Sequence, residues 1–119
     1  MIAFDEASRV FRLTTRETSY LFRVTPYGHL EHVYYGARIP DGPVDSLLVK
    51  RTIQRGSSVL YREDDDTYCL DNIPLEWSGI GCGDYRNAPG EFLMPDGSFT
   101  ADFVYESHAV TGGAIEMET

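Results

Sequence analysis

The strongest constraint on the fold of this chain is a short-range alternation of apolar and polar residues that recurs along its first half. Side chains of a β-strand point alternately to opposite faces, so a period of two predicts strands with one buried face. Strands are predicted at residues 2–4, 10–13, 20–24 and 30–35, with weaker candidates at 47–49 and 59–61. Residues 5–8 and the Pro26-Tyr27-Gly28 triplet supply turns between the first strands. Helical periodicity is nearly absent, so the sequence predicts an all-β chain.

A further hairpin is predicted late in the chain. Residues 92–94 and 98–105 flank Pro95-Asp96-Gly97, a triplet typical of a tight turn. One face of the second arm would carry Phe99, Ala101, Phe103 and Tyr105. Short strands separated by turns about every ten residues are typical of two antiparallel sheets packed face to face. With 119 residues there is room for one domain. The predicted fold is therefore an all-β β-sandwich with long irregular loops over residues 1–119.

Charge and hydropathy narrow the classes of function. The chain has 19 acidic and 10 basic residues, a formal net charge of −9, and Lys50 is its single lysine. An acidic chain without a basic stripe repels phosphate backbones, so no nucleic-acid partner is predicted. No apolar run approaches a membrane span, and the acidic start does not resemble a signal peptide, so no membrane partner is predicted. Two cysteines, Cys69 and Cys82, are too few for a disulfide framework, which favours a cytoplasmic location.

Three groups of residues could in principle bind a metal ion or a phosphate, and none has the required spacing. The acids at 63–66 are consecutive, whereas a calcium loop needs alternating ligands, so a solvated turn is predicted. His29 and His32 are placed to point to opposite faces of a strand, which disfavours zinc. The glycine-rich residues 79–83 precede no helical pattern, so they more plausibly let the backbone approach another segment closely than bind phosphate. No metal and no cofactor are predicted.

Residues 68–89 form the most unusual stretch, with prolines, glycines and aromatic residues but no helical or strand periodicity. Long loops in compact domains are usually functional or disordered, and the apolar residues here favour an ordered loop. If residues 84–86 are extended, Asp84 and Arg86 face one way and Tyr85 the other, with Trp77 nearby. Two interpretations stay open. The carboxylate and guanidinium could bind a hydroxyl-rich ligand beside Trp77, or they could pair with each other while Trp77 and Tyr85 join the core.

The same stretch carries a resemblance to a known family. Its pattern Tyr68-x-Leu70-Asp71-x-x-Pro74-x-Glu76-Trp77-x-Gly79-x-Gly81-x-Gly83-Asp84-Tyr85-Arg86-x-x-Pro89 resembles the N-terminal domain of family 36 glycoside hydrolases, the bacterial α-galactosidases or melibiases. The pattern Leu30-x-His32-x-Tyr34-Tyr35-Gly36 is similar to their opening strands. Their late hairpin is similar to Asp96-Gly97-Ser98 followed by Asp102-Phe103-x-Tyr105-x-Ser107-His108. The resemblance covers essentially the whole chain.

The resemblance implies both a fold and an activity for the parent protein. Members are similar in having an N-terminal β-supersandwich, a catalytic (β/α)₈ barrel and a C-terminal β domain. They are retaining glycosidases that hydrolyse terminal α-galactosyl groups with two carboxylates on the barrel. A barrel needs about 250 residues, so the catalytic barrel is not present in this chain. Residues 1–119 then correspond to the N-terminal part of the supersandwich, which is expected to be non-catalytic, whereas the parent is expected to be an α-galactosidase.

The role that the resemblance implies is architectural. The domain would pack on its own catalytic barrel, support a homo-oligomer and shape the rim of the active site, so α-galactosides would be partners only through the parent. The candidates for rim or interface residues are Trp77, Asp84, Tyr85 and Arg86, and no catalytic residue is assigned. An alternative is a free-standing carbohydrate-binding module that presents Trp77, Tyr85 and Tyr68 as an exposed platform. A third interpretation is a domain for oligomerisation alone.

Overall fold

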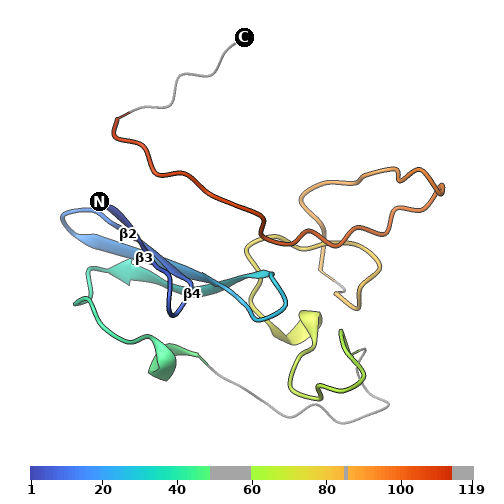
Figure 1. Ribbon diagram of the computed structural model, residues 1–119, viewed down its shortest axis with the longest axis horizontal. Helices are drawn as coiled ribbons and strands as arrows, with labels where there is room; N and C mark the ends of the chain where they lie inside the picture. The colour runs from blue at the N-terminus through green and yellow to red at the C-terminus, as the bar shows by residue number, and fades with distance from the viewer. Residues whose placement is uncertain (49–59, 85, 114–119) are drawn as a thin grey trace.

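A computed structural model of the chain describes residues 1–48, 60–84 and 86–113. Four strands follow one another: β1 (Ile2–Asp5), β2 (Val10–Thr14), β3 (Thr18–Val24) and β4 (Leu30–Ala37). Each pairs antiparallel with the next, which gives one sheet of order β1-β2-β3-β4 (Figure 1). The four strands predicted from the alternation are confirmed, and the structure extends them by one or two residues.

The predicted turns between these strands are also confirmed, and side chains hold them. Between β1 and β2, Asp5 Oδ1 accepts hydrogen bonds from the backbone N–H groups of Ala7 (2.9 Å) and Ser8 (3.2 Å). Arg9 completes this turn in the left-handed region, with φ of 56°. Between β3 and β4, Gly28 has φ of 93°, which glycine adopts without strain. These turns fix the register of the sheet.

The register places aromatic side chains in a row on one face of the sheet, here called the aromatic face. Phe4 lies opposite Phe11, and Phe11 lies opposite Phe22. Directly opposite residues of an antiparallel pair share a face, and the ring centroids are 4.5 and 4.7 Å apart. Tyr105 and His108, from the C-terminal segment, pack edge-on against Phe11. The segment that follows the loops therefore covers one end of the aromatic face.

The opposite face of the sheet carries the aliphatic core. Val10, Leu21 and Val44 form the buried cluster, and Val44 comes from the loop that follows β4. A β-bulge in β4 adds to this cluster: Leu21 pairs with Tyr34 and Phe22 with His32, so Val33 is the extra residue. Val33 and Tyr34 both pack against the cluster as a result.

The second half of the described chain is irregular. It contains 3₁₀ turns at η1 (Asp45–Leu47) and η2 (Leu70–Asn72). The weaker strand predictions are wrong where the structure describes them, because Leu47 belongs to η1 and residues 60–61 form no strand. Val49 and Val59 lie outside the described residues. An isolated antiparallel bridge between Glu31 and Leu75 ties this half to β4, with backbone hydrogen bonds from His32 to Pro74 (2.6 Å) and from Glu76 to Leu30 (2.9 Å).

The late hairpin is confirmed as a turn but not as a pair of strands. The N–H of Met94 donates to the carbonyl of Ser98 (2.9 Å) and the N–H of Gly97 to the carbonyl of Met94 (2.9 Å). Beyond the turn, the backbone bonds go elsewhere: Ala101 donates to the carbonyl of Ile80 (2.9 Å) and Tyr105 to that of Gly28 (2.7 Å). The predicted strand at 98–105 is therefore wrong, because its polar groups are satisfied one at a time by other segments.

The predicted all-β class is confirmed, together with its long irregular loops. The described residues contain no α-helix and one four-stranded sheet. In Figure 1 the loops of residues 60–100 lie beside the end of the sheet near the β3–β4 turn, and the last described residues run back toward β1. The loop around Tyr68 and the C-terminal segment around Tyr105 thereby both contact the β3–β4 turn.

Candidate functional site

Asp84 and Arg86, two of the four residues singled out from the sequence, bond to each other. The Arg86 Nε donates to Asp84 Oδ1 at 2.8 Å, and the Arg86 backbone N–H donates to the same oxygen at 3.1 Å. The other guanidinium nitrogens donate to the carbonyl of Ile73 (2.6 Å) and to that of Leu70 in η2. The pair is thus a clamp, here called the Arg86 clamp, that holds the two ends of the loop 70–86 together.

Burial and the neighbouring positive charge shift the pKa of Asp84 in opposite directions. Its side chain has no exposed surface, and burial alone raises the pKa of a carboxyl group. Hydrogen bonds from Arg86 and the positive charge of its guanidinium outweigh burial, so the pKa of Asp84 lies below its usual value. The second oxygen, Oδ2, is buried and receives no hydrogen bond from the described residues. The carboxylate is therefore held as an anion inside the loop and does not face solvent.

Trp77 lies apart from the clamp, in a cluster of partly exposed aromatic side chains. Its ring centroid is 6.0 Å from that of Phe103, and Phe103 is 4.9 Å from Phe92. Their exposed fractions are 44% for Trp77, 42% for Phe92 and 45% for Phe103. We call these three residues the Trp77 patch. The contacts are edge-to-face, with interplanar angles of 81° and 67°, so the rings present no common flat surface.

The remaining aromatic candidates have different outcomes. Tyr85 lies outside the described residues. Tyr68, which the carbohydrate-binding alternative placed on an exposed platform, is 7% exposed and belongs to the interior. The structure therefore brings Asp84 together with Arg86, and it places Trp77 with Phe92 and Phe103, which the sequence had not grouped with it.

The glycine-rich residues allow the close backbone approach that the sequence predicted. A Cβ atom at Gly79 would collide with the carbonyl oxygen of Ala101, and one at Gly81 would lie 2.5 Å from Thr100 Oγ1. Gly81 also has φ of 91°. This loop therefore lies directly against the C-terminal segment because it has no side chains in the way.

A second polar site, which sequence reasoning missed, joins three distant segments beneath this contact. His29, in the β3–β4 turn, is 4% exposed. Its Nε2 lies 2.6 Å from Asp102 Oδ1 and its Nδ1 lies 2.7 Å from the Tyr68 hydroxyl. Tyr61 donates to Asp102 Oδ2 at 2.5 Å, and Thr25 Oγ1 lies 2.6 Å from the Tyr68 hydroxyl. We call these five residues the His29 network.

One assignment of protons satisfies every group of the His29 network. If Asp102 is ionised, it can only accept, and with a neutral imidazole the hydrogen of His29 is then on Nε2 while Nδ1 accepts from Tyr68. The Tyr68 hydroxyl in turn accepts from Thr25, whose oxygen accepts from the backbone N–H of His29 at 3.1 Å. Each buried polar group has a partner. Such satisfied networks favour one arrangement of the chain over its alternatives.

Asp102, His29 and Tyr68 follow one another as carboxylate, imidazole and hydroxyl, an order that resembles a catalytic triad. The surroundings of the hydroxyl are nevertheless those of a structural site. A nucleophile needs access to substrate and an activated hydroxyl. Tyr68 is buried, and burial raises the pKa of its hydroxyl to about 12. No sequence signal could have found this site, because Asp102 and His29 lie 73 positions apart.

His32 belongs to a separate contact from His29. Its Nδ1 lies 2.9 Å from Glu76 Oε1, and both side chains are partly exposed. Within the described ranges, no three His, Cys, Asp or Glu side chains are grouped as a metal site would require. The run at 63–66 includes a turn, as predicted. Cys69 and Cys82 are not joined to each other.

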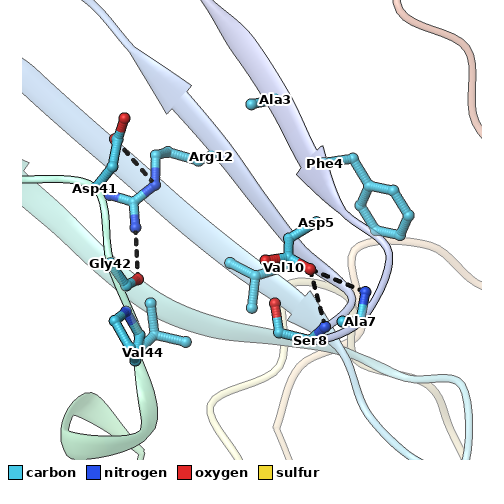
Figure 2. Close-up of a pocket in the computed structure, with 11 residues that line it drawn as sticks. Ala3, Phe4, Asp5, Ala7, Ser8, Val10, Arg12, Asp41, Gly42 and Val44 are labelled. Atoms are coloured by element: carbon cyan, nitrogen blue, oxygen red, sulfur yellow. Dashed lines mark hydrogen bonds and ion pairs between the residues drawn. The ribbon is translucent and has the colours of Figure 1, made fainter.

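An open cleft lies on the aliphatic side of the sheet, beside β1. Its volume is about 690 Å³. Figure 2 shows two polar ends: Arg12 pairs with Asp41 at 3.5 Å at one end, and Asp5 caps the β1–β2 turn at the other. Val10 and Val44 lie between these ends. The cleft thus offers an apolar floor and no unengaged charged group that would select a polar ligand.

Comparison with known proteins gives a consistent result along the chain. Residues 28–119 match the family described as the glycosyl hydrolase family 36 N-terminal domain. The bifunctional α-galactosidase/sucrose kinase AgaSK of Mediterraneibacter gnavus is 29% identical over 98% of this chain and 12% of its own length. Alpha-galactosidase 1 of Pediococcus pentosaceus is 31% identical over 98% of this chain and 16% of its own length.

A solved structure agrees with these relatives. The galactosidase domain of AgaSK superimposes with a TM-score of 0.79 at 33% identity, covering 90% of this chain and 15% of that one. The chain thus spans about one eighth to one sixth of the curated relatives it matches. Among the described residues, no helix is long and apolar enough to cross a membrane.

Proposed function

This chain belongs to the glycosyl hydrolase family 36 N-terminal domain family, and we propose that it is the non-catalytic opening part of that domain in an α-galactosidase. The relatives that it matches carry that name, and the chain spans only 12–16% of their length. The parent would hydrolyse terminal α-galactosyl groups on a catalytic barrel elsewhere in the polypeptide. The family match over residues 28–119 is the observation that carries this proposal.

A non-catalytic role fits the use that the chain makes of Asp84 and Asp102. Retaining glycoside hydrolysis needs two carboxyl groups about 5 Å apart, both open to the sugar. Asp84 is enclosed in the Arg86 clamp, and Asp102 accepts from His29 and Tyr61. Both acids are therefore engaged in holding segments of the chain together.

The proposed partner is the catalytic barrel of the same parent, and the Trp77 patch is the proposed contact. Each of its three aromatic side chains is more than 40% exposed. Covering them with another protein surface would remove apolar area from water, which is favourable. The Arg86 clamp would act indirectly by fixing the loop that carries Trp77 toward the rim of the active site. Tyr85, between the clamp residues in sequence, is a further rim candidate.

The carbohydrate-binding alternative has less support. Its favourable observation is the exposed ring of Trp77. Sugar rings stack on a flat aromatic face, whereas the rings of the Trp77 patch meet at steep angles, and Tyr68 is buried. A protein surface with its own protruding side chains fits such a cluster better. We further propose a homo-oligomeric parent in the cytoplasm that binds no nucleic acid, a proposal that rests on the acidic charge and the small number of cysteines.

Co-expression of this chain with the remainder of the parent polypeptide tests the proposal. The chain alone is expected to hydrolyse no α-galactoside, whereas the two pieces together should co-purify and be active. Trp77→Ala and Phe103→Ala should weaken the association by about tenfold or more, as removal of buried aromatic anchors does. Phe99→Ala is the matched control, since Phe99 is 50% exposed in the same segment but outside the patch. Turnover by the chain alone would overturn the proposal.

A further inference from the structure

Residues 98–108, here called segment 98–108, are attached to the rest of the described chain at a few separate points. The segment contains no strand, and Ala101 is its one buried residue. Past the turn that precedes it, its backbone bonds to other described residues are those of Ala101 to Ile80 and of Tyr105 to Gly28. A segment with few buried contacts and few backbone bonds opens at a lower free energy than a paired sheet does.

The sheet does not depend on segment 98–108 for its own core. Strand β3 pairs with a neighbouring strand on each side, and Leu21 in it has no exposed surface. Leu21 packs with Val10 and Val44 on the aliphatic face. Segment 98–108 instead contacts the opposite, aromatic face and the β3–β4 turn. Its removal would therefore leave the pairing and the aliphatic core of the sheet in place.

Asp102 lies between the two backbone bonds of the segment and makes its strongest polar contacts. One carboxylate oxygen is 2.6 Å from His29 Nε2 and the other is 2.5 Å from the Tyr61 hydroxyl. The Asp102 side chain is 31% exposed, so water has access to this contact. When the segment lifts away, water replaces the carboxylate beside His29, and the imidazole is not left without a partner. Opening therefore avoids the penalty of an unsatisfied buried group.

The next residue, Phe103, links the same segment to the Trp77 patch. Its ring packs edge-on against those of Trp77 and Phe92, with centroid distances of 6.0 and 4.9 Å. Trp77 and Phe92 lie outside segment 98–108, so both ring contacts are lost when the segment moves away. The patch is thus complete only while Asp102 holds the segment against the β3–β4 turn.

We propose that segment 98–108 opens and closes as one unit on an intact sheet, that Asp102 is its latch, and that closing completes the Trp77 patch. Ala101, Asp102 and Tyr105 lie within five positions, so loss of the carboxylate contact also loosens the backbone bond on each side of it. The coupling is reciprocal: a surface that covers the patch favours the closed segment, and a weaker latch weakens the patch. This goes beyond the proposed function, because the opening belongs to this chain and needs no partner.

Amide hydrogen exchange of the chain, followed by NMR under conditions where it reports the opening equilibrium, tests the opening. The amides of Ala101 and Tyr105 should exchange about a hundredfold or more faster than those of β3. Their rates should also depend little on low concentrations of urea, because opening exposes little surface. Equal urea dependence of the two sets of amides would mean that the segment opens only when the whole chain unfolds, and would overturn the proposal.

A variant in the sheet gives an independent test of the same point. Leu21→Val weakens the aliphatic core, which the open and closed states share, so the β3 amides should exchange about fivefold faster. The amides of Ala101 and Tyr105 should keep their rates, because the substitution does not change the balance between open and closed segment. If they accelerate as much as the β3 amides, the segment does not open on an intact sheet and the proposal is refuted.

Asp102→Asn tests the latch. Removing the charge of the acceptor should raise the exchange rates of the Ala101 and Tyr105 amides about tenfold. Glu106→Gln is the matched control, because Glu106 is exposed in the same segment and the substitution also removes one negative charge. Equal rates in the two variants would show that Asp102 is not the latch.

Trp77→Ala tests whether closing completes the patch. Trp77 lies outside the segment, yet its loss should speed the exchange of the Ala101 amide about fivefold, because the ring contact with Phe103 exists only in the closed state. In a Phe103→Ala background the same substitution should have no further effect. Phe99→Ala is the control, since Phe99 is 50% exposed in the segment and outside the patch. Equal effects of Trp77→Ala with and without Phe103 would refute the coupling.

Discussion

Asp102 accepts hydrogen bonds from His29 and from Tyr61 at once, although His29 precedes it by 73 positions. This carboxylate joins the C-terminal segment to the β3–β4 turn, together with the backbone hydrogen bond from Tyr105 to the carbonyl of Gly28. The contact is charge-assisted, which makes it stronger than a bond between neutral groups. Among the described residues, polar side chains such as Asp102 and single backbone bonds to β4 and the β3–β4 turn fix the irregular half of the chain to the sheet, rather than a second layer of strands.

We predict that Asp102→Asn destabilises the chain by about 1–3 kcal/mol, because a charge-assisted acceptor is lost beneath a buried imidazole. Urea unfolding followed by Trp77 emission measures the loss, since Trp77 packs against Phe103, the next residue. Glu106→Gln is the control, because Glu106 is exposed in the same segment. Equal effects of the two substitutions would show that the His29 network does not hold the segment.

Arg86→Lys should destabilise the chain by about 1–3 kcal/mol. Lysine keeps the charge but cannot donate at once to Asp84 and to the carbonyls of Ile73 and Leu70. The matched substitution is Arg62→Lys, because Arg62 pairs with Asp64 on the surface, with exposed fractions of 55% and 75%. Surface pairs contribute little, so this control should change the free energy of unfolding by less than about 0.5 kcal/mol. Chemical denaturation compares the two.

The clamp also predicts a dependence of stability on acid. The pKa of Asp84 is lower in the folded chain than in the unfolded one, where it is about 3.9. Its contribution is therefore fully present above that value and is lost as the pH falls through the folded pKa. Asp84→Asn should be less stable than the wild type near neutral pH, and the difference should shrink below about pH 3.9. A difference that stays constant with pH would contradict this account.

The hydrogen bond of Tyr61 predicts the opposite dependence, a loss of stability as the pH rises into the alkaline range. Its hydrogen bond to Asp102, and then burial, raise the pKa of Tyr61 to about 12. The unfolded hydroxyl ionises near pH 10, so this contribution is present below about pH 10 and is lost as the pH rises toward 12. Absorbance titration of tyrosinate should lose a late-ionising group in Tyr61→Phe. An unchanged alkaline titration in that variant would show that Tyr61 ionises normally.

Gly79→Ala should be strongly destabilising, by about 2 kcal/mol or more, because the added Cβ would meet the backbone carbonyl of Ala101. Backbone cannot rotate away as a flexible side chain can. Gly42→Ala provides the comparison, since no heavy atom lies within 4 Å of a Cβ built there. Thermal unfolding of the two variants should differ by several degrees or more, and similar midpoints would contradict the close approach.

The strands up to Ala37 could be predicted from the sequence because each is specified locally. Alternation sets the buried face, and a turn such as Pro26-Tyr27-Gly28 joins neighbours along the chain. The pairing of Asp84 with Arg86 is one of the two interpretations that the sequence allows, since the two lie two positions apart. The core position that this interpretation gives to Trp77 is wrong, because Trp77 is 44% exposed.

The rest could not be predicted, because it depends on contacts between segments far apart in the chain. The alternation at 98–105 is real, but Ala101 and Tyr105 donate to Ile80 and Gly28 instead of to a strand. In the same way, His29 has no local feature that points to Tyr68 or Asp102. Periodicity reports which side chains could share a face, and it carries no information about which segment supplies the partner.

The order of pairing in the sheet bears on when the chain can fold during synthesis. Every strand pairs with its neighbour in sequence, so the sheet is complete once residues 2–37 are available. Such short-range contacts close quickly, whereas the contact of His29 with Asp102 must wait for the end of the described chain. We therefore expect the nascent sheet to form first, with the half-made His29 network open to water until translation delivers Asp102.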